Sequence, residues 1–140
     1  ASMISVSSAM DKTGAGKLLA KFCVDLLGGT PSPLFVAALL FLVSSFLTQF
    51  MSNTATATLL CPIGVAIAQQ IGASPHAVVM SITIGIACAY ATPVGTPPNT
   101  LVLGPGGYRF MDYVKVGTPL IFVSFIVSMI VIPIVWPFFK

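Results

Sequence analysis

The feature that most limits what this chain can fold into is the absence of charge over long stretches. No Asp, Glu, Lys or Arg occurs from residue 26 to residue 108, and none occurs from residue 116 to residue 139. Soluble domains carry charged side chains at about a quarter of their positions, whereas only 6% of this 140-residue chain is charged. A membrane-spanning helix needs about 20 mostly apolar residues, and both stretches exceed that length. The sequence therefore predicts an all-α integral membrane protein.

Composition excludes two further classes of protein. Hydrophobic residues make up 56% of the chain, which excludes intrinsic disorder. The net charge of +3 comes from six scattered basic residues, so there is no basic stripe to follow a phosphate backbone and we expect no nucleic-acid partner. The three cysteines lie far apart without metal-ligand spacing, which favours buried apolar roles.

Breaks rich in Gly, Pro and small polar residues divide the chain into four predicted segments. The segments are residues 1–32, an amphipathic or interfacial helix with its connector; residues 33–73, a re-entrant helical hairpin with a Ser-Asn-Thr tip; residues 74–108, a broken transmembrane helix; and residues 109–140, an interfacial segment followed by a C-terminal transmembrane helix that begins near Gly117.

The hairpin is inferred from two short apolar runs, residues 34–50 and 55–71, which are barely long enough to span a bilayer. Only a short polar tip separates them, and it carries no charge. A turn in water or headgroups usually carries charged residues. Ser, Asn and Thr can instead satisfy exposed backbone groups inside a protein, so this pattern predicts a re-entrant hairpin.

The broken helix is inferred from a Pro-rich interruption in apolar sequence. Residues 76–91 form an apolar run in which Ser81, Gly85 and Ala89 make a small-residue ridge suited to close helix packing. Residues 92–100 contain three prolines and a glycine, so they cannot continue a helix. Apolar sequence resumes at residue 101, which predicts a helix broken within the membrane.

The two polar interruptions suggest an anion site. Ser52 or Asn53 can cap the helix that begins near Thr54, and the free N–H groups and dipole of such a helix start favour an anion. Thr96 can cap the second half of the broken helix, with Pro97 at its first position.

The same interruptions suggest a cation site. Carbonyl groups after the first half-helix, including those of Pro93, Val94 and Gly95, lack normal helical partners. Carbonyl and hydroxyl oxygens suit a hard monovalent cation such as Na⁺. Facing helix breaks are how secondary transporters build substrate and ion sites.

Other interpretations remain open at this point. Ser and Thr in apolar helices often bond their own backbone, and a Pro-rich break can be a simple kink. A channel-like module would use the hairpin as a pore lining. An enzyme is not expected, because His76 reads as an interface or capping residue and no acid–base pair occurs in the apolar runs. A proton-coupled carrier needs an ionisable group within the membrane, and residues 77–107 offer only Cys88 and Tyr90.

The motif Ser52-Asn53-Thr54-Ala55, followed by Thr-Pro-Val-Gly-Thr-Pro-Pro-Asn at residues 92–99, resembles the divalent anion–sodium symporter family. This family of dicarboxylate, citrate and sulfate carriers belongs to the wider ion-transporter superfamily. Gly-Pro-Gly-Gly-Tyr at residues 104–108 and Asp112-Tyr113 with Lys115 and Gly117 are also similar to it, so the resemblance covers nearly the whole chain.

The resemblance implies two inverted repeats, of which this chain matches the C-terminal one. It implies a secondary active transporter that couples a di- or tricarboxylate or a sulfate-like anion to sodium. An anion exchanger, a proton-coupled carrier or a channel-like module of the same architecture is the alternative. The implied partners are the anion, sodium, the lipid bilayer, the missing N-terminal repeat and a second copy in a homodimer. The implied location is the bacterial inner membrane, with no cofactor other than Na⁺ as the coupling ion.

The resemblance also implies roles for individual residues, in which sodium binds first and orders both loops. The implied substrate-binding residues are Ser52, Asn53, Thr54, Thr96 and Pro97; the implied sodium-binding residues are Thr48, Ser52, Asn53, Gly95 and Asn99, the last of which also braces the loop.

Overall fold

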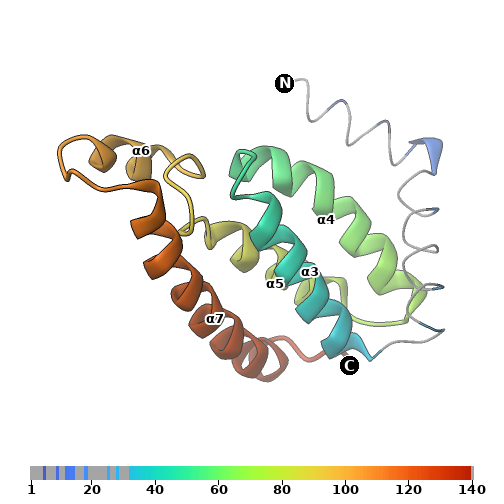
Figure 1. Cartoon of the computed structure of the whole chain (residues 1–140). Coiled ribbons are helices and arrows are strands. Elements are labelled where there is room, and N and C mark those ends of the chain that lie inside the picture. Colours follow the sequence, from blue (N-terminus) through green and yellow to red (C-terminus); the bar gives the residue numbers. More distant parts are fainter. Residues whose placement is uncertain are drawn as a thin grey trace.

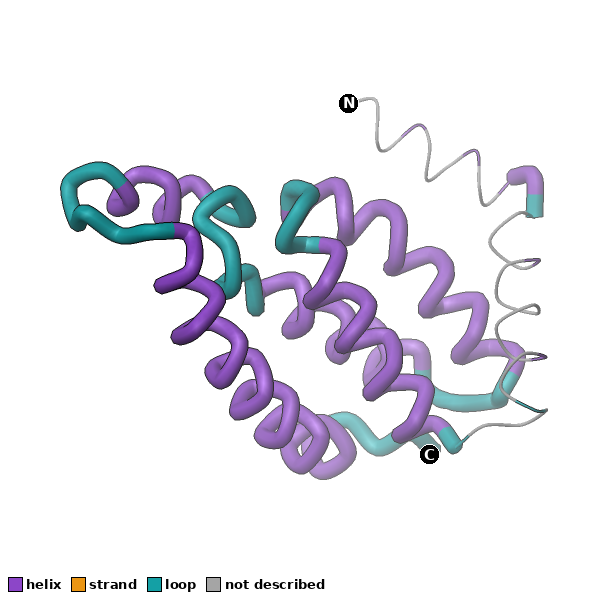
Figure 2. Tube along the Cα trace, viewed as in Figure 1, coloured by secondary structure: helices purple, strands orange, loops and turns teal. Residues whose placement is uncertain are grey.

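The structure is a computed structural model that describes residues 32–139 and the isolated positions 5, 9, 12–14, 18, 25 and 28. Of the interfacial helix and connector predicted for residues 1–32, only Ser32 lies within this continuous part. Residues 32–139 contain helices and no strand, which confirms the all-α prediction for them (Figures 1 and 2). The helices are α3 (Pro33–Leu47), α4 (Asn53–Gln70), α5 (Pro75–Ala87), α6 (Pro97–Leu103) and α7 (Phe110–Val135).

Helices α3 and α4 form a hairpin, and residues 48–52 between them are termed the hairpin tip. Each helix begins at a serine: the Ser32 hydroxyl accepts a hydrogen bond from the Phe35 N–H, and the Ser52 hydroxyl accepts one from the Ala55 N–H, both at 3.2 Å. Such caps satisfy N–H groups that have no helical partner. The two apolar runs therefore form helices, as predicted, but the predicted Ser-Asn-Thr tip is shifted. Helix α3 ends at Leu47, and Asn53 and Thr54 already belong to α4, because Ser52 is its cap.

Helix α5 packs against both arms of the hairpin, and more extensively against α3 than against α4. The apolar core lies at these contacts and includes Val36, Leu40, Leu60, Ile67, Val78, Ile82 and Ile86. Gly85 makes the approach of α3 and α5 possible, because a Cβ at this position would lie 2.7 Å from the Phe41 carbonyl oxygen. Ser81 on the same helix face is also buried, so these two small residues form a packing surface. Ala89, the third residue of the predicted ridge, is buried too but lies beyond the end of α5.

The predicted break in the third helix is present, but it begins earlier than expected. Helix α5 ends at Ala87 rather than at Ala91, and residues 88–96, termed the break loop, are irregular. The Cys88 carbonyl accepts a hydrogen bond from the Gln49 side chain instead of from a later N–H of its own helix. Helix α6 then starts with Pro97 at its first position, as predicted, and ends in a glycine-rich turn where Gly107 has a positive φ of 61°.

Helix α7 is continuous where the sequence analysis separated an interfacial segment from a span. The Asp112 carboxylate accepts a hydrogen bond of 2.8 Å from the Arg109 N–H, which starts the helix within the segment taken as interfacial. Among the described residues, α7 alone is long and apolar enough to cross a membrane. Its 26 residues measure roughly 39 Å at the rise of an α-helix.

Two close contacts attach α7 to the rest of the bundle. A Cβ at Gly117 would lie 2.6 Å from the Ala91 Cα, so glycine lets α7 cross directly over the break loop. Farther along, the Phe125 ring meets the Phe41 ring of α3 edge to face at a centroid distance of 5.4 Å. Figure 1 shows α7 crossing beside α3 and α5, while α6 lies apart near the start of α7.

Candidate functional site

The hairpin tip and the break loop lie next to each other, and Gln49 joins them. Figure 2 shows the two irregular segments side by side between the helices. The Gln49 side-chain amide donates to the Cys88 carbonyl at 2.9 Å and accepts from the Ala91 N–H at 3.2 Å. The Thr92 hydroxyl donates to the Gln49 backbone carbonyl at 2.9 Å. Three direct hydrogen bonds therefore connect segments that are far apart in sequence.

Thr48, Asn53 and Gly95 meet at this junction. The fully buried Thr48 hydroxyl donates to Asn53 Oδ1 at 2.6 Å. A Cβ at Gly95 would lie 3.3 Å from the Thr48 carbonyl oxygen and 3.1 Å from the Ala89 Cβ, so the absence of a side chain lets the loop approach the tip. Three of the predicted sodium-binding residues therefore lie together.

Several backbone oxygens at the junction are available to a cation. Within residues 32–139, no hydrogen bond is donated to the carbonyl oxygens of Thr48, Val94 or Gly95. The Pro93 carbonyl accepts a bond of 2.6 Å from the Thr100 hydroxyl rather than from a helical N–H. The prediction that the carbonyls of Pro93, Val94 and Gly95 lack normal helical partners is thus correct, and the last two are free within residues 32–139.

A pocket of about 540 Å³ opens between the tip and the break loop. It is lined by Phe50, Met51, Ser52, Val94, Gly95, Pro97, Thr100 and Leu101. Three predicted site residues, Ser52, Gly95 and Pro97, are in its wall, and no lining residue carries a charge. Any ion held here would therefore be bound by dipoles and hydroxyl groups.

The two helix starts beside this pocket differ in what they offer an anion. At the start of α4, the N–H groups of Asn53 and Thr54 donate to no acceptor within residues 32–139. At the start of α6, Pro97 and Pro98 have no N–H, and the Asn99 N–H donates to the Thr96 carbonyl. Helix α4 therefore supplies the free N–H donors and the positive end of a longer helix dipole.

Asn99 braces the break loop as predicted. Its Nδ2 donates to the Ala89 carbonyl at 2.9 Å and to the Thr92 carbonyl at 3.1 Å. The Tyr113 hydroxyl of α7 donates to the Asn99 carbonyl at 2.9 Å. The two bonds from Asn99 satisfy loop carbonyls that the helix break leaves without partners. Together with the bond from Tyr113 they hold α6 in place, since no residue of α6 is buried.

Three predicted site residues lie beside the pocket without lining it. Thr54 is exposed on the first turn of α4. Thr96 occupies the N-cap position of α6, as expected, but its side chain makes no capping hydrogen bond. Asn99 does not line the pocket, and its side-chain nitrogen donates to the Ala89 carbonyl of the break loop. Their predicted substrate and sodium contacts stay predictions.

Sequence reasoning missed Gln49, Thr92 and Tyr113, which together hold the site. Gln49 is 6% exposed and forms the main connection across the junction. The available signal was a glutamine in an apolar run directly before the tip, since a buried amide in such a run needs hydrogen-bond partners.

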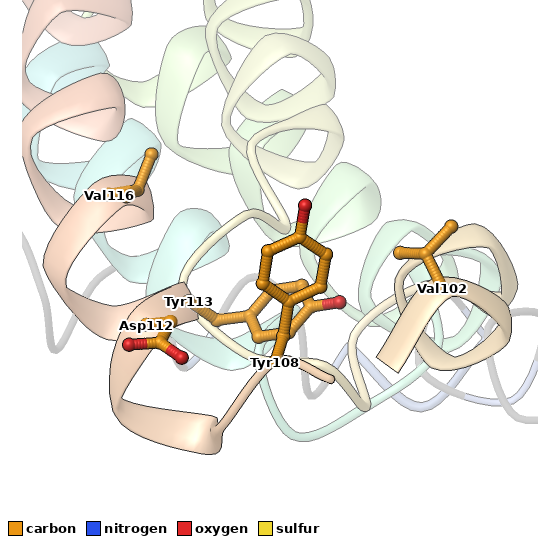
Figure 3. A pocket seen from close by; sticks show the side chains of 5 residues that line it. All are labelled: Val102, Tyr108, Asp112, Tyr113 and Val116. Atoms are coloured by element: carbon orange, nitrogen blue, oxygen red, sulfur yellow. The ribbon is translucent and has the colours of Figure 1, made fainter. Parts of the chain in front are cut away.

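A second pocket, of about 340 Å³, lies between α6 and the start of α7. Figure 3 shows the rings of Tyr108 and Tyr113 between Val102 on one side and Asp112 with Val116 on the other. The ring centroids are 6.0 Å apart. The Asp112 carboxylate already caps α7, so this pocket is mainly an apolar and aromatic recess.

Comparison with known proteins identifies the family. Residues 1–139 match the citrate transporter family. The uncharacterized transporter YfbS of Escherichia coli is 40% identical over 97% of this chain, which covers 22% of that protein. The sodium-dependent dicarboxylate transporter SdcS of Staphylococcus saprophyticus is 34% identical over 72% of the chain and 20% of its own length.

A mammalian relative is similar to the same degree. Solute carrier family 13 member 2 of the rabbit, Oryctolagus cuniculus, is 38% identical over 73% of the chain, which covers 17% of that protein. The chain thus spans about a fifth of the length of these curated relatives, all of them transporters or solute carriers. The chain belongs to the citrate transporter family, and the resemblance to divalent anion–sodium symporters is confirmed.

Proposed function

We propose that this chain is part of a secondary active transporter that carries a di- or tricarboxylate or a sulfate-like anion together with sodium. The observation that carries this proposal is the junction of tip and break loop, where uncharged donors and acceptors surround one pocket. A site without formal charge favours an anion and a cation together, because each ion lowers the cost of holding the other away from water. Relatives named sodium-dependent dicarboxylate transporters support the same combination.

The anion would bind at the start of α4. Ser52 lines the pocket, and the free N–H groups of Asn53 and Thr54 belong to the same helix turn. Carboxylate and sulfate oxygens accept hydrogen bonds from such groups, and the helix dipole adds to the attraction. Thr96 and Pro97 would border the anion from the side of the break loop, where the Thr96 hydroxyl makes no capping bond.

Sodium would bind where the tip and the loop meet. Thr48, Asn53 and Gly95 lie together there and present hydroxyl, amide and carbonyl oxygens. Ser52 would contribute its oxygen from the tip. Asn99 would contribute through its side-chain oxygen, which accepts no hydrogen bond within residues 32–139. Sodium bound first would complete the surroundings of the anion.

We further propose that α3 and α4 form a re-entrant hairpin and that α5, the break loop and α6 form a broken transmembrane helix. The 15 residues of α3 measure roughly 22 Å and the 13 residues of α5 roughly 20 Å, which is less than the about 30 Å of a hydrocarbon core. Such short helices suit a binding site near the middle of the membrane.

The rest of the carrier would supply what this chain lacks. We propose that the chain is the C-terminal inverted repeat, and that an N-terminal repeat closes the pocket from the other side. The outward face of α7 carries exposed apolar residues, including Phe122, Ile126, Ile130 and Ile134, which suits contact with lipid or with that repeat. We propose a homodimer in the bacterial inner membrane.

The test is uptake of radiolabelled succinate, citrate and sulfate into proteoliposomes that hold the complete carrier containing this chain. An inward Na⁺ gradient is compared with an equal K⁺ gradient. Sodium-dependent accumulation of one anion is the expected result. An anion flux that is the same with the Na⁺ and the K⁺ gradient would refute the symport proposal and favour an exchanger, a proton-coupled carrier or a channel.

A variant tests the site itself. Asn53→Asp places a negative charge beside the free N–H groups of α4, so we expect anion uptake to fall at least tenfold. Gln69→Glu is the matched control, because it makes the same change from amide to carboxylate at an exposed residue near the other end of α4, outside the pocket. Equal uptake by both variants would refute the assignment of the anion site.

A further inference from the structure

The Gln49 side chain uses both its donor and its acceptor groups at the junction. Its Nε2 donates to the Ser45 carbonyl and to the Cys88 carbonyl, each at 2.9 Å, and its Oε1 accepts from the Ala91 N–H at 3.2 Å. An amide carries two N–H donors and a carbonyl acceptor, so both donors are used. Few side chains other than glutamine have this combination at this length.

The bonds of Gln49 replace those that the broken helix has lost. Cys88 is the C-cap of α5, and its ψ of 41° takes its carbonyl out of the helical pattern. The Ala91 N–H is likewise in the irregular loop. A buried backbone group without a partner is costly, and Gln49 satisfies one acceptor and one donor on the loop at once.

We propose that Gln49 is a positioning residue that holds the hairpin tip and the break loop together as one unit. Gln49 itself contacts neither the proposed sodium ion nor the proposed anion. It fixes the distance from Thr48 to Gly95, which have no hydrogen bond to each other and meet only through close packing. The part of the inference that concerns ion affinity rests on the proposed sodium symport, whereas the part that concerns tip–loop spacing does not.

This role predicts a specific effect for each substitution at residue 49. Leu fills similar space but leaves the Cys88 carbonyl and the Ala91 N–H without their partner. An ionised Glu accepts only, so it would face the Ser45 and Cys88 carbonyls without a proton to donate. A protonated Glu donates only one bond, so neither form of Glu replaces both donors of Gln49.

The experiment measures tip–loop spacing and transport on the same variants. Spin labels are placed at Phe50 and Val94, which are exposed on the tip and the loop and also line the pocket, in the complete carrier with its native cysteines replaced by alanine. Distance distributions are recorded on the labelled carrier, and sodium-dependent uptake on the same carrier without labels, for Gln49, Gln49→Leu and Gln49→Glu. Gln69→Glu is the matched control, since Gln69 is exposed near the end of α4.

The proposal predicts a narrow distribution for the parent and a broad one for Gln49→Leu. Gln49→Glu should also give a broader distribution than the parent, whereas Gln69→Glu should match the parent. The sodium concentration for half-maximal uptake should rise about tenfold wherever the distribution is broad, with maximal uptake changed less than the sodium requirement.

Two results separate the positioning role from the transport role. Distributions in Gln49→Leu and Gln49→Glu that stay as narrow as that of the parent would overturn the inference. Distance distributions that change as predicted, together with anion uptake that does not depend on sodium, would support the positioning role and refute only the symport proposal.

Discussion

Replacing Thr48 by valine should weaken sodium binding by an amount that the structure allows us to work out. Valine keeps the shape of threonine but removes the hydroxyl that donates to Asn53 Oδ1 at 2.6 Å. In the parent, this bond holds Asn53 in the orientation that presents its oxygen to the proposed sodium ion, and a bond of this kind contributes about 1 kcal/mol. In the valine variant, sodium binding must itself order Asn53 and also loses the Thr48 hydroxyl oxygen as a proposed ligand, so the total loss is about 1–2 kcal/mol.

That free energy corresponds to about a 5- to 30-fold change in an equilibrium constant. The assay is a sodium titration of anion uptake by the complete carrier in proteoliposomes, for the parent, Thr48→Val and Thr48→Ser. The half-saturating sodium concentration should rise by that factor in the valine variant and stay within about twofold in the serine variant, because serine keeps the donor.

Thr83→Val is the control, since the Thr83 hydroxyl bonds only a carbonyl of its own helix. It should leave the sodium titration unchanged. A sodium requirement of Thr48→Val equal to that of the parent would refute the reasoning, because it would mean that neither the Thr48 hydroxyl nor its bond to Asn53 contributes to the ion site.

Two further predictions concern the frame around the site. Gly85→Val should lower the thermal unfolding temperature of the detergent-solubilised carrier, because its Cβ would meet the Phe41 carbonyl of α3 at 2.7 Å and such overpacking costs about 1–3 kcal/mol; an unchanged melting curve would contradict the packing. Tyr113→Phe removes the bond to the Asn99 carbonyl. Amide hydrogen exchange in α6 should therefore become about fivefold faster, the factor for about 1 kcal/mol, while exchange in α4 is unchanged. Equal exchange rates in α6 of the parent and of Tyr113→Phe would contradict the role of this bond.

The helix breaks were predictable because their chemistry is local. Pro97 at the first position of α6, Ser52 as the cap of α4 and the glycines after α6 each act within a few residues. Prolines, caps and glycines are signals of this short range. The two interruptions and the short helices around them could therefore be predicted from the sequence.

The end of α5 could not be predicted in the same way. Residues 88–91 are as apolar as the helix before them, and nothing local stops the helix at Ala87. The backbone leaves the helix where Gln49, 39 residues away in sequence, bonds to Cys88. A contact of that kind is set by tertiary structure, so hydropathy and propensity do not reveal it.

The start of α7 differed from the prediction although its signal is local. Arg109, Asp112 and Lys115 resembled an interfacial segment, but the carboxylate of Asp112 caps the helix on which it lies. The charges therefore begin the same helix that continues as the apolar span.

The neighbourhood of Thr48, Asn53 and Gly95 was expected only from the family resemblance, since no spacing in one sequence brings two loops together. The resemblance named these residues, and the structure adds the atoms that join them. It does not supply Gln49, whose burial and bonds became visible only in the folded chain.

The most direct test of the central claim is protection of the pocket by its ions. Val94 lines the pocket and its side chain is exposed, so a Val94→Cys carrier without its native cysteines can be labelled with a maleimide. Gln69→Cys, exposed near the end of α4, is the control outside the pocket. We predict that sodium and a transported anion together slow labelling at residue 94, that potassium and the same anion do not, and that residue 69 is unaffected. Labelling at residue 94 that is the same under all these conditions would contradict the claim that this pocket holds the anion and sodium.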